Sequence, residues 1–122
     1  AEIKTEIEGL IRTYGPAEAA IENPFYAQNM RTALLLGQVR GAVLVAVAGT
    51  GCALAEYSAL EIKKAVTGYG QADKEQVMTM VRALLGLGDE RIPLDASDAL
   101  AAAICHLNTR LYQLKVEGQE TS

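Results

Sequence analysis

Two short apolar segments, separated by a long apolar one, constrain the fold of this chain most strongly. The short segments are 17–21 and 52–56, and the stretch 28–48 between them is rich in Leu and Ala. The short lengths favour strands, whereas the middle stretch is long enough for a helix. Two strands joined through a helix form a parallel pair, because a tight hairpin cannot connect parallel strands. The sequence therefore predicts an α/β fold.

Four further segments predict helices. They cover residues 1–14, 58–66, 73–85 and 94–114. Ser58 and Asp73 stand where N-caps are preferred, and the polar tail 115–122 is expected to fray. The order is helix, strand, helix, strand and three helices, so about five helices and two parallel strands. This is little sheet for so many helices, because sheets usually contain about 4–6 strands, and it indicates a helix-rich fragment.

Composition indicates one globular domain over residues 1–122. Half of the residues are hydrophobic and the net charge is only −4, which excludes disorder and a uniformly basic surface. The uninterrupted apolar run 42–48 is shorter than the ~18 residues of a membrane span, so no membrane contact is predicted. Two cysteines without metal spacing and the lack of a signal peptide indicate free thiols and a cytoplasmic location.

Three carboxylates are candidates for chemistry. Glu22 ends a predicted strand, at the edge where open α/β sheets bind ligands. Its position alone favours the ordinary alternative, a strand end that meets water. Asp95 and Asp98 lie three residues apart at the start of the last helix, where a capping role is the favoured interpretation. Ala102, one turn later on the same face, would let this helix approach a sheet and bring the aspartates beside Glu22.

Such a cluster would have a restricted chemistry. Carboxylates that lie close together repel one another unless protons or cations intervene. Without His or Cys they select hard ions, above all Mg²⁺, which also binds phosphate oxygens. Two such ions can activate a water and stabilise a leaving oxygen, which favours phosphodiester hydrolysis.

Weaker features have ordinary interpretations. His106 has no partner at ligand spacing and is expected at the surface or the edge of the core. The turn Gly68-Tyr69-Gly70 lacks the order of a phosphate loop and is interpreted as a helix break. Phe25, in a predicted loop, is by default a core residue, although an aromatic beside an acidic site can also stack on bases.

Four blocks of sequence, in order and at consistent spacing, carry a family resemblance. They are Ala-Ile-Glu-Asn-Pro-Phe at 20–25, Ala-Leu-Leu-Leu-Gly-Gln-Val-Arg-Gly at 33–41, Gln-Ala-Asp-Lys-Glu-Gln-Val at 71–77 and Asp-Ala-Ser-Asp-Ala-Leu-Ala at 95–101. From about residue 17 to 107 the chain closely resembles the RuvC family of Holliday junction resolvases. The resemblance implies a ribonuclease H-like fold and a homodimer that nicks a four-way junction symmetrically. It also implies two Mg²⁺ ions per site, with Mn²⁺ as a substitute, and work beside the RuvA and RuvB branch-migration proteins.

The resemblance also implies roles for particular residues. Glu22, Asp95 and Asp98 match three of the family's metal-binding acids, and Lys74 matches a catalytic basic residue. The residues expected to contact DNA, from the resemblance or from the local basic surface, are Phe25, Arg31, Lys63, Lys64 and Lys74. The helix around 34–47 resembles the family's dimer helix, with the predicted contacts Leu34, Gly37, Gly41 and Leu44.

One departure from the family pattern is large. The family begins with a strand that bears an Asp-Pro-Gly-type motif, whose Asp is the fourth metal-binding acid; that strand and the next two have no match here. The chain is therefore expected to be an N-terminally truncated domain that binds metal poorly and cleaves little. Two alternatives stay open: a non-catalytic dimeric module that binds junctions, and a ribonuclease H-like nuclease with another substrate.

Overall fold

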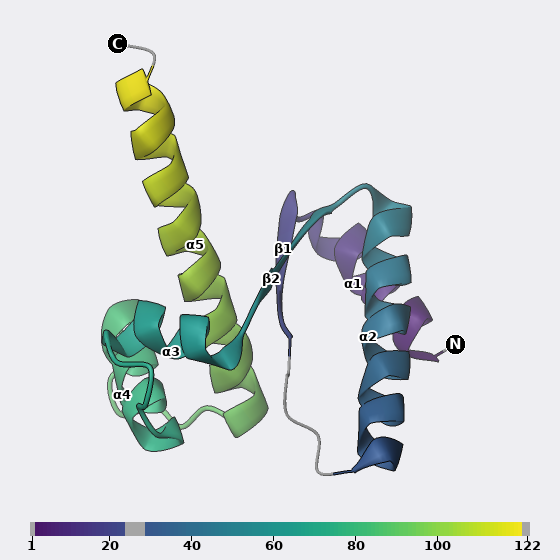
Figure 1. Ribbon diagram of the computed structural model, residues 1–122, viewed down its shortest axis with the longest axis horizontal. Helices are drawn as coiled ribbons and strands as arrows, with labels where there is room; N and C mark the ends of the chain where they lie inside the picture. Colours follow the sequence, from purple (N-terminus) through teal and green to yellow (C-terminus); the bar gives the residue numbers. More distant parts are fainter. Residues whose placement is uncertain (1, 24–28, 121–122) are drawn as a thin grey trace. The chain divides into compact units, whose positions relative to one another are not determined.

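The computed structural model describes residues 2–23 and 29–120 of the 122-residue chain. Its elements in chain order are α1 (Glu2–Tyr14), β1 (Glu18–Glu22), α2 (Met30–Thr50), β2 (Ala53–Tyr57), α3 (Ala59–Thr67), α4 (Lys74–Leu85) and α5 (Leu94–Glu120) (Figure 1). The predicted order of helices and strands is confirmed. The predicted fraying of 115–120 is wrong: α5 continues to Glu120, because Lys, Gln and Glu favour helices and no proline interrupts them.

The two strands form a parallel pair, as the sequence predicted. At one end the Ala53 N–H donates to the Ala17 carbonyl at 3.1 Å, and at the other the Asn23 N–H donates to the Tyr57 carbonyl at 2.7 Å. Both strands therefore advance in the same direction, with α2 as the connection between them. The carboxyl ends of both strands consequently lie at the same edge of the sheet.

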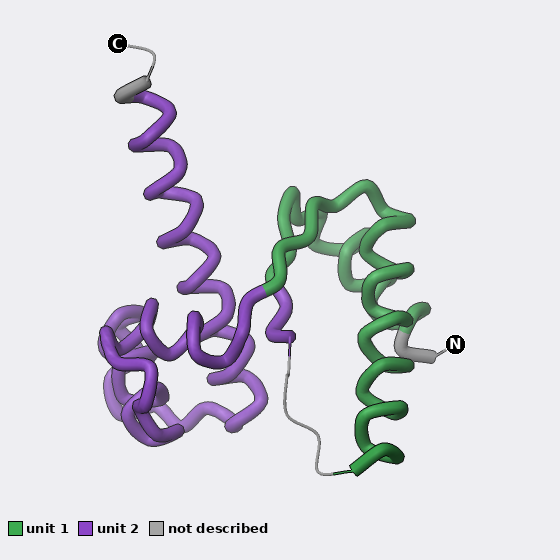
Figure 2. The backbone as a smooth tube through the Cα atoms, viewed as in Figure 1, with its two compact units in different colours: residues 1–20, 24–56 green, residues 21–23, 57–122 purple. Residues whose placement is uncertain are grey.

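The described residues form two compact units (Figure 2). Unit 1 comprises those of 1–20 and 24–56, and unit 2 those of 21–23 and 57–122. Unit 1 thus contains α1, α2 and most of both strands, whereas unit 2 contains the last residues of the strands with α3, α4 and α5. Glu22, Asp95 and Asp98 all belong to unit 2.

In unit 1, helices α1 and α2 pack against each other. The Asn29 side chain accepts a hydrogen bond from the Thr32 N–H at 2.9 Å and starts α2, and Gly51, with φ of 77°, ends it. Ala46 and Val47 are the buried core residues of this unit among those the structure describes. Most of the apolar surface of α2 is therefore uncovered.

In unit 2, the helices α3, α4 and α5 pack against one another around a continuous core. The fully buried or nearly buried residues are Tyr57, Ile62, Val66, Ala72, Val77, Val81, Ser97, Ala101, Ala102, Ile104 and Cys105. Ser58 and Asp73 each form a capping box, so both predicted N-caps are confirmed. Gly70 permits a close approach: a Cβ there would lie 2.5 Å from Leu60 Cδ1.

Candidate active site

Glu22 is the last residue of β1, and its side chain is exposed. The peptide that follows it is held in place, because the Asn23 N–H donates to the Tyr57 carbonyl. Glu22 therefore lies at the carboxyl edge of the parallel pair, the position that the sequence predicted. Phe25, which is expected to contact DNA, lies outside the described residues.

The two aspartates lie in the first turn of α5. The favoured interpretation of Asp95 as N-cap is wrong, because the helix begins one residue earlier, at Leu94, and the Ser97 N–H donates to the Pro93 carbonyl at 3.0 Å. Asp95 is exposed and Asp98 is half-buried, and Ser97 between them is 1% exposed. Within the described residues neither carboxylate has a hydrogen bond, so both stay available to a ligand, and their charges suit a helix N-terminus.

The three acids do not form a complete metal site by themselves. Across residues 2–23 and 29–120, no group of three or more His, Cys, Asp or Glu side chains is placed to hold a metal ion. Their oxygen donors suit a hard divalent cation, but their arrangement supplies too few ligands. The chemistry of the donors fits Mg²⁺, and the geometry of the described residues does not.

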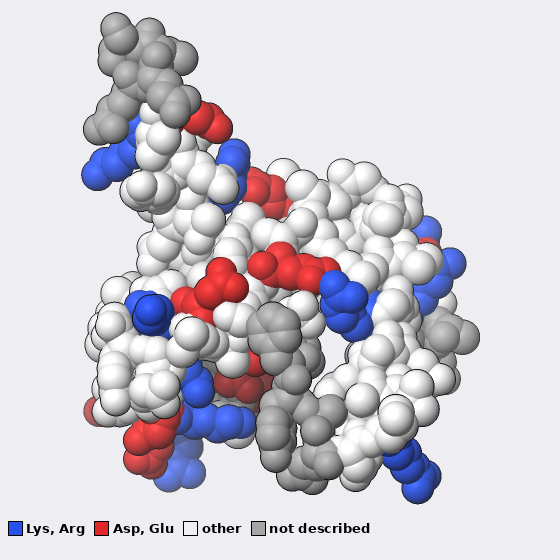
Figure 3. All heavy atoms as spheres, viewed as in Figure 1, with Lys and Arg blue, Asp and Glu red and all other residues white. Residues whose placement is uncertain are grey.

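The predicted basic residues lie in different parts of the molecule. Lys63, half-buried, and Lys64, exposed, lie near the middle of α3, and the exposed Lys74 begins α4, all in unit 2. Arg31, also exposed, lies at the start of α2 in unit 1. On the face shown in Figure 3, basic and acidic side chains lie beside one another over α3 and α4. This region is therefore a mixed surface, and its lysines are accessible to an anion.

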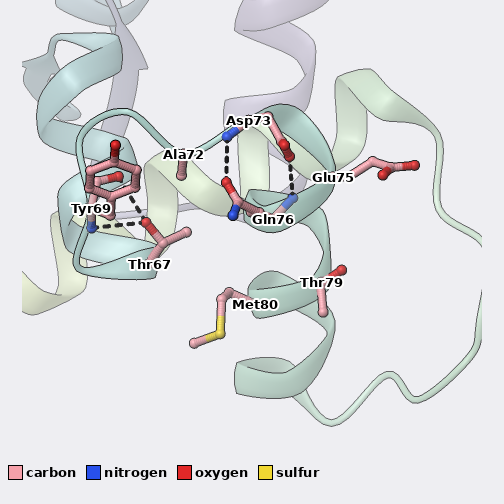
Figure 4. Close-up of a pocket in the computed structure, with 8 residues that line it drawn as sticks. All are labelled: Thr67, Tyr69, Ala72, Asp73, Glu75, Gln76, Thr79 and Met80. Atoms are coloured by element: carbon pink, nitrogen blue, oxygen red, sulfur yellow. Dashed lines mark hydrogen bonds between the residues drawn. The ribbon is translucent and has the colours of Figure 1, made fainter.

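A cavity of 460 Å³ lies where the Gly68–Gly70 turn meets the first turns of α4 (Figure 4). Thr67 and Tyr69 line one side, and Asp73, Gln76, Thr79 and Met80 line the other. Asp73 and Gln76 bond reciprocally at 2.8 Å in their capping box, which holds the start of α4. The predicted helix break at 68–70 is confirmed, but the sequence did not indicate the cavity. It contains none of the three predicted acids.

Sequence reasoning missed a polar contact beside the acid-bearing elements. The Tyr57 hydroxyl and His106 Nδ1 lie 2.7 Å apart, in hydrogen-bond contact, with ring centroids 5.8 Å apart. His106 is half-buried, which confirms the expected place at the edge of the core. Next to it, burial and the charge of Glu61 raise the pKa of the Cys105 thiol, although a hydrogen bond with Thr109 opposes this rise. Tyr57 and His106 lie 49 residues apart, and no local motif marks such a pair.

The predicted dimer contacts lie on α2. Leu34 is exposed and Leu44 is half-buried. A Cβ added at Gly37 or Gly41 would meet no described atom within 4 Å apart from its chain neighbours and the backbone of its own helix. By length and composition alone, α2 is also long and apolar enough to cross a membrane, and 11% of its most apolar stretch is buried. The sequence prediction considered only the uninterrupted apolar run 42–48, whereas the whole helix Met30–Thr50 is apolar enough to pass this test. Arg40, near its middle, forms an ion pair with Glu56 at 2.6 Å.

The family described as crossover junction endodeoxyribonuclease RuvC matches this chain over residues 1–106. The RuvC of Moorella thermoacetica is 50% identical over 106 residues, which cover 87% of this chain and 64% of the relative. The RuvC of Pseudomonas entomophila is 52% identical over 104 residues, 85% of this chain and 59% of the relative. The chain thus spans about three-fifths of the length of these curated relatives.

Two solved structures of RuvC proteins are similar to this chain. RuvC of Thermus thermophilus in complex with a Holliday junction substrate has a TM-score of 0.80 to this chain, with 34% identity over 87% of this chain and 64% of that one. A second Thermus thermophilus RuvC structure gives a TM-score of 0.78 with the same identity and coverage. These neighbours confirm the ribonuclease H-like fold that the resemblance implied. Since the family model matches most of its residues, the chain belongs to the RuvC family.

Proposed function

We propose that this chain is the junction-binding and acid-bearing part of a crossover junction endodeoxyribonuclease, a hydrolase that resolves Holliday junctions in DNA recombination and repair. The observation that carries the proposal is the structural match to a RuvC in complex with a Holliday junction, with 34% identity over 87% of this chain. The family match over residues 1–106 supports it independently.

The acids Glu22, Asp95 and Asp98 are the proposed catalytic and metal-binding residues, with Mg²⁺ as the natural ion. Nucleases of this family are metal-dependent in general. Because the described residues do not gather three ligands, we expect this chain alone to cleave slowly or not at all. Its carboxylates, without hydrogen bonds to the described chain, stay ready to accept a metal when further ligands are supplied.

The proposed DNA surface comprises the lysines of α3 and α4. Lys64 and Lys74 are exposed and Lys63 is half-exposed, so their ammonium groups can reach phosphates. Lys74 is also a proposed catalytic residue near the scissile phosphate. Phe25 and Arg31 complete the proposed set, Phe25 as an aromatic at the centre of the junction.

The proposed assembly is a homodimer formed through α2, with Leu34, Gly37, Gly41 and Leu44 at the interface. The uncovered apolar surface of this helix and the open space at its glycines support this. A two-fold dimer would present two equivalent sites to a nearly two-fold junction. Covering by a second subunit also accounts for the apolar composition of α2, in a cytoplasmic protein that works beside RuvA and RuvB.

Binding and cleavage of a synthetic four-way junction test the proposal. The matched control is a linear duplex of the same sequence, and each DNA is measured in Mg²⁺ and in Ca²⁺. We expect selective binding to the junction with little nicking. Equal affinity for both DNAs would contradict the proposal.

One observation favours a second function, that of a non-catalytic dimeric module that binds junctions. The lack of a three-ligand group among the described residues is what such a module would show. Supplying the N-terminal segment of a longer relative separates the two functions. Restored Mg²⁺-dependent nicking identifies the nuclease, whereas binding without nicking identifies the module.

A further inference from the structure

Tyr57 contacts both of the elements that bear the acids. It is the last residue of β2 and only 8% exposed. Its carbonyl accepts from the Asn23 N–H at 2.7 Å, directly after Glu22. Its hydroxyl lies 2.7 Å from His106 Nδ1 on α5, the helix whose first turn contains the aspartates. One residue therefore joins the end of β1 to α5, and all of these contacts lie within unit 2.

The buried face of α5 carries short side chains in its first turns. Ser97, Ala101 and Ala102 allow close approach there but form shallow ridges, and the larger buried residue, Ile104, follows nearer to His106. Shallow ridges resist sliding and rotation of a helix weakly, whereas a hydrogen bond is directional. The contact between Tyr57 and His106 is thus suited to fix the register of α5.

Two further contacts hold α5 at the same level. Cys105 Sγ lies 3.8 Å from the Glu61 carbonyl, and Asn108 Nδ2 donates to the Ala65 carbonyl at 3.4 Å. Both join α5 to α3, and neither reaches β1 or β2. Because a helix rises 1.5 Å per residue, the aspartates lie about 12–17 Å along α5 from His106, and a shift of the helix at His106 moves them equally.

We propose that Tyr57 is a positioning residue: its carbonyl holds the end of β1, and its hydroxyl, through His106, sets where α5 places the aspartates relative to Glu22. This inference rests on the proposed function, because the distances between the three acids matter only if these acids bind a metal together. Tyr57 itself touches none of the reacting groups.

The test measures that spacing directly. Nitroxide labels on Glu22→Cys and Asp95→Cys, both exposed positions, report the distance between the elements in the full chain with Cys52→Ser. Cys105 stays in place because it is buried. Tyr57→Phe retains the ring and the carbonyl and removes only the hydroxyl. We expect it to shift or broaden the distance distribution by about 1.5 Å, the rise of one helical residue.

Variants at His106 separate positioning from general stability. His106→Asn retains a polar group near the place of Nδ1 and should keep the distance distribution as narrow as in the wild type. His106→Leu should broaden or shift it as Tyr57→Phe does. The distance distribution of the double variant Tyr57→Phe/His106→Leu should be no broader than that of either single variant, because both substitutions remove the same hydrogen bond. A merely structural contact would lower the melting temperature in these variants without changing the distance.

The inference is overturned if Tyr57→Phe leaves the distance distribution unchanged, or if the distribution of His106→Asn is as broad as that of His106→Leu. Junction binding by the unlabelled wild-type chain is measured in parallel. Loss of junction selectivity with an intact effect of Tyr57→Phe on the distance contradicts the proposed function alone. Retained selectivity with no effect on the distance contradicts the positioning role alone.

Discussion

The two units of the chain differ in what holds them together. Unit 2 packs three helices around valine, isoleucine and alanine side chains, and it contains all three proposed acids. Unit 1 packs α1 on α2 with Ala46 and Val47 as its buried core residues among those described, and it exposes several leucines and valines of α2. One unit has a core of its own, and the other presents an exposed apolar surface of the kind that marks an interaction site.

This difference assigns different tasks to the two units. The acids lie on a part of the chain that is stabilised by its own packing, which suits residues that must keep a fixed geometry. The proposed dimer contacts lie on the part that gains most from a partner, since its apolar surface is already exposed. Substitutions in unit 2 should therefore change folding, and substitutions on α2 should change association.

The largest effect is expected from a charge in the core of unit 2. Val81 in α4 is 0% exposed, so Val81→Asp would bury a carboxylate without a partner. We expect a loss of about 4 kcal/mol in the free energy of unfolding, measured by urea denaturation followed by circular dichroism. The control is Leu84→Asp in the same helix, at a position that is 52% exposed, which should change stability by about 0.5 kcal/mol or less. Equal losses in both variants would mean that unit 2 has no specific core.

A charge on α2 should act on association instead. Leu34 is 62% exposed in the single chain and belongs to the proposed interface. Leu34→Glu should weaken self-association about 100-fold, because a buried carboxylate at an interface is not compensated, and should leave the circular dichroism spectrum unchanged. Sedimentation over a range of concentrations measures this. Leu35→Glu is the matched control, equally exposed at 60% but about 100° further round the helix. A monomeric wild-type chain, or a stronger effect at Leu35, would contradict the proposed interface.

The order of elements could be predicted from local signals, and the site only in part. Ser58 and Asp73 mark helix starts because a cap depends on neighbouring residues alone. The N-cap interpretation of Asp95 failed because the helix begins at Leu94, directly after the proline at 93, so that Asp95 already lies inside the first turn. The contact of Tyr57 with His106 joins residues 49 positions apart, and only packing brings them together. The place of Glu22 followed from the strand pattern, whereas its proposed metal-binding role depends on the family resemblance.

A smaller effect is expected from the ion pair of unit 1. Arg40 and Glu56 join α2 to β2, at N–O distances of 2.6 and 2.7 Å, and both side chains are partly exposed. Because water screens such pairs, Arg40→Met should lower the free energy of unfolding by about 0.5 kcal/mol, and less at high salt. A double-mutant cycle with Glu56→Gln isolates the pair. Coupling above about 2 kcal/mol would show that this pair, and not apolar packing, holds unit 1 together.

The smallest effect concerns alkaline stability, through Cys105 in the core of unit 2. Burial, with the charge of Glu61, raises the pKa of this thiol above its ordinary value of 9.0. Above pH 9 the unfolded chain releases the proton while the folded chain retains it, so the free energy of unfolding falls as pH rises, and below that range the thiol contributes no slope. The stability difference between wild type and Cys105→Ala should therefore decrease between pH 8 and pH 10. Other groups that titrate there cancel in this difference. A parallel pH dependence of wild type and Cys105→Ala would show that the thiol of Cys105 is not sealed from water.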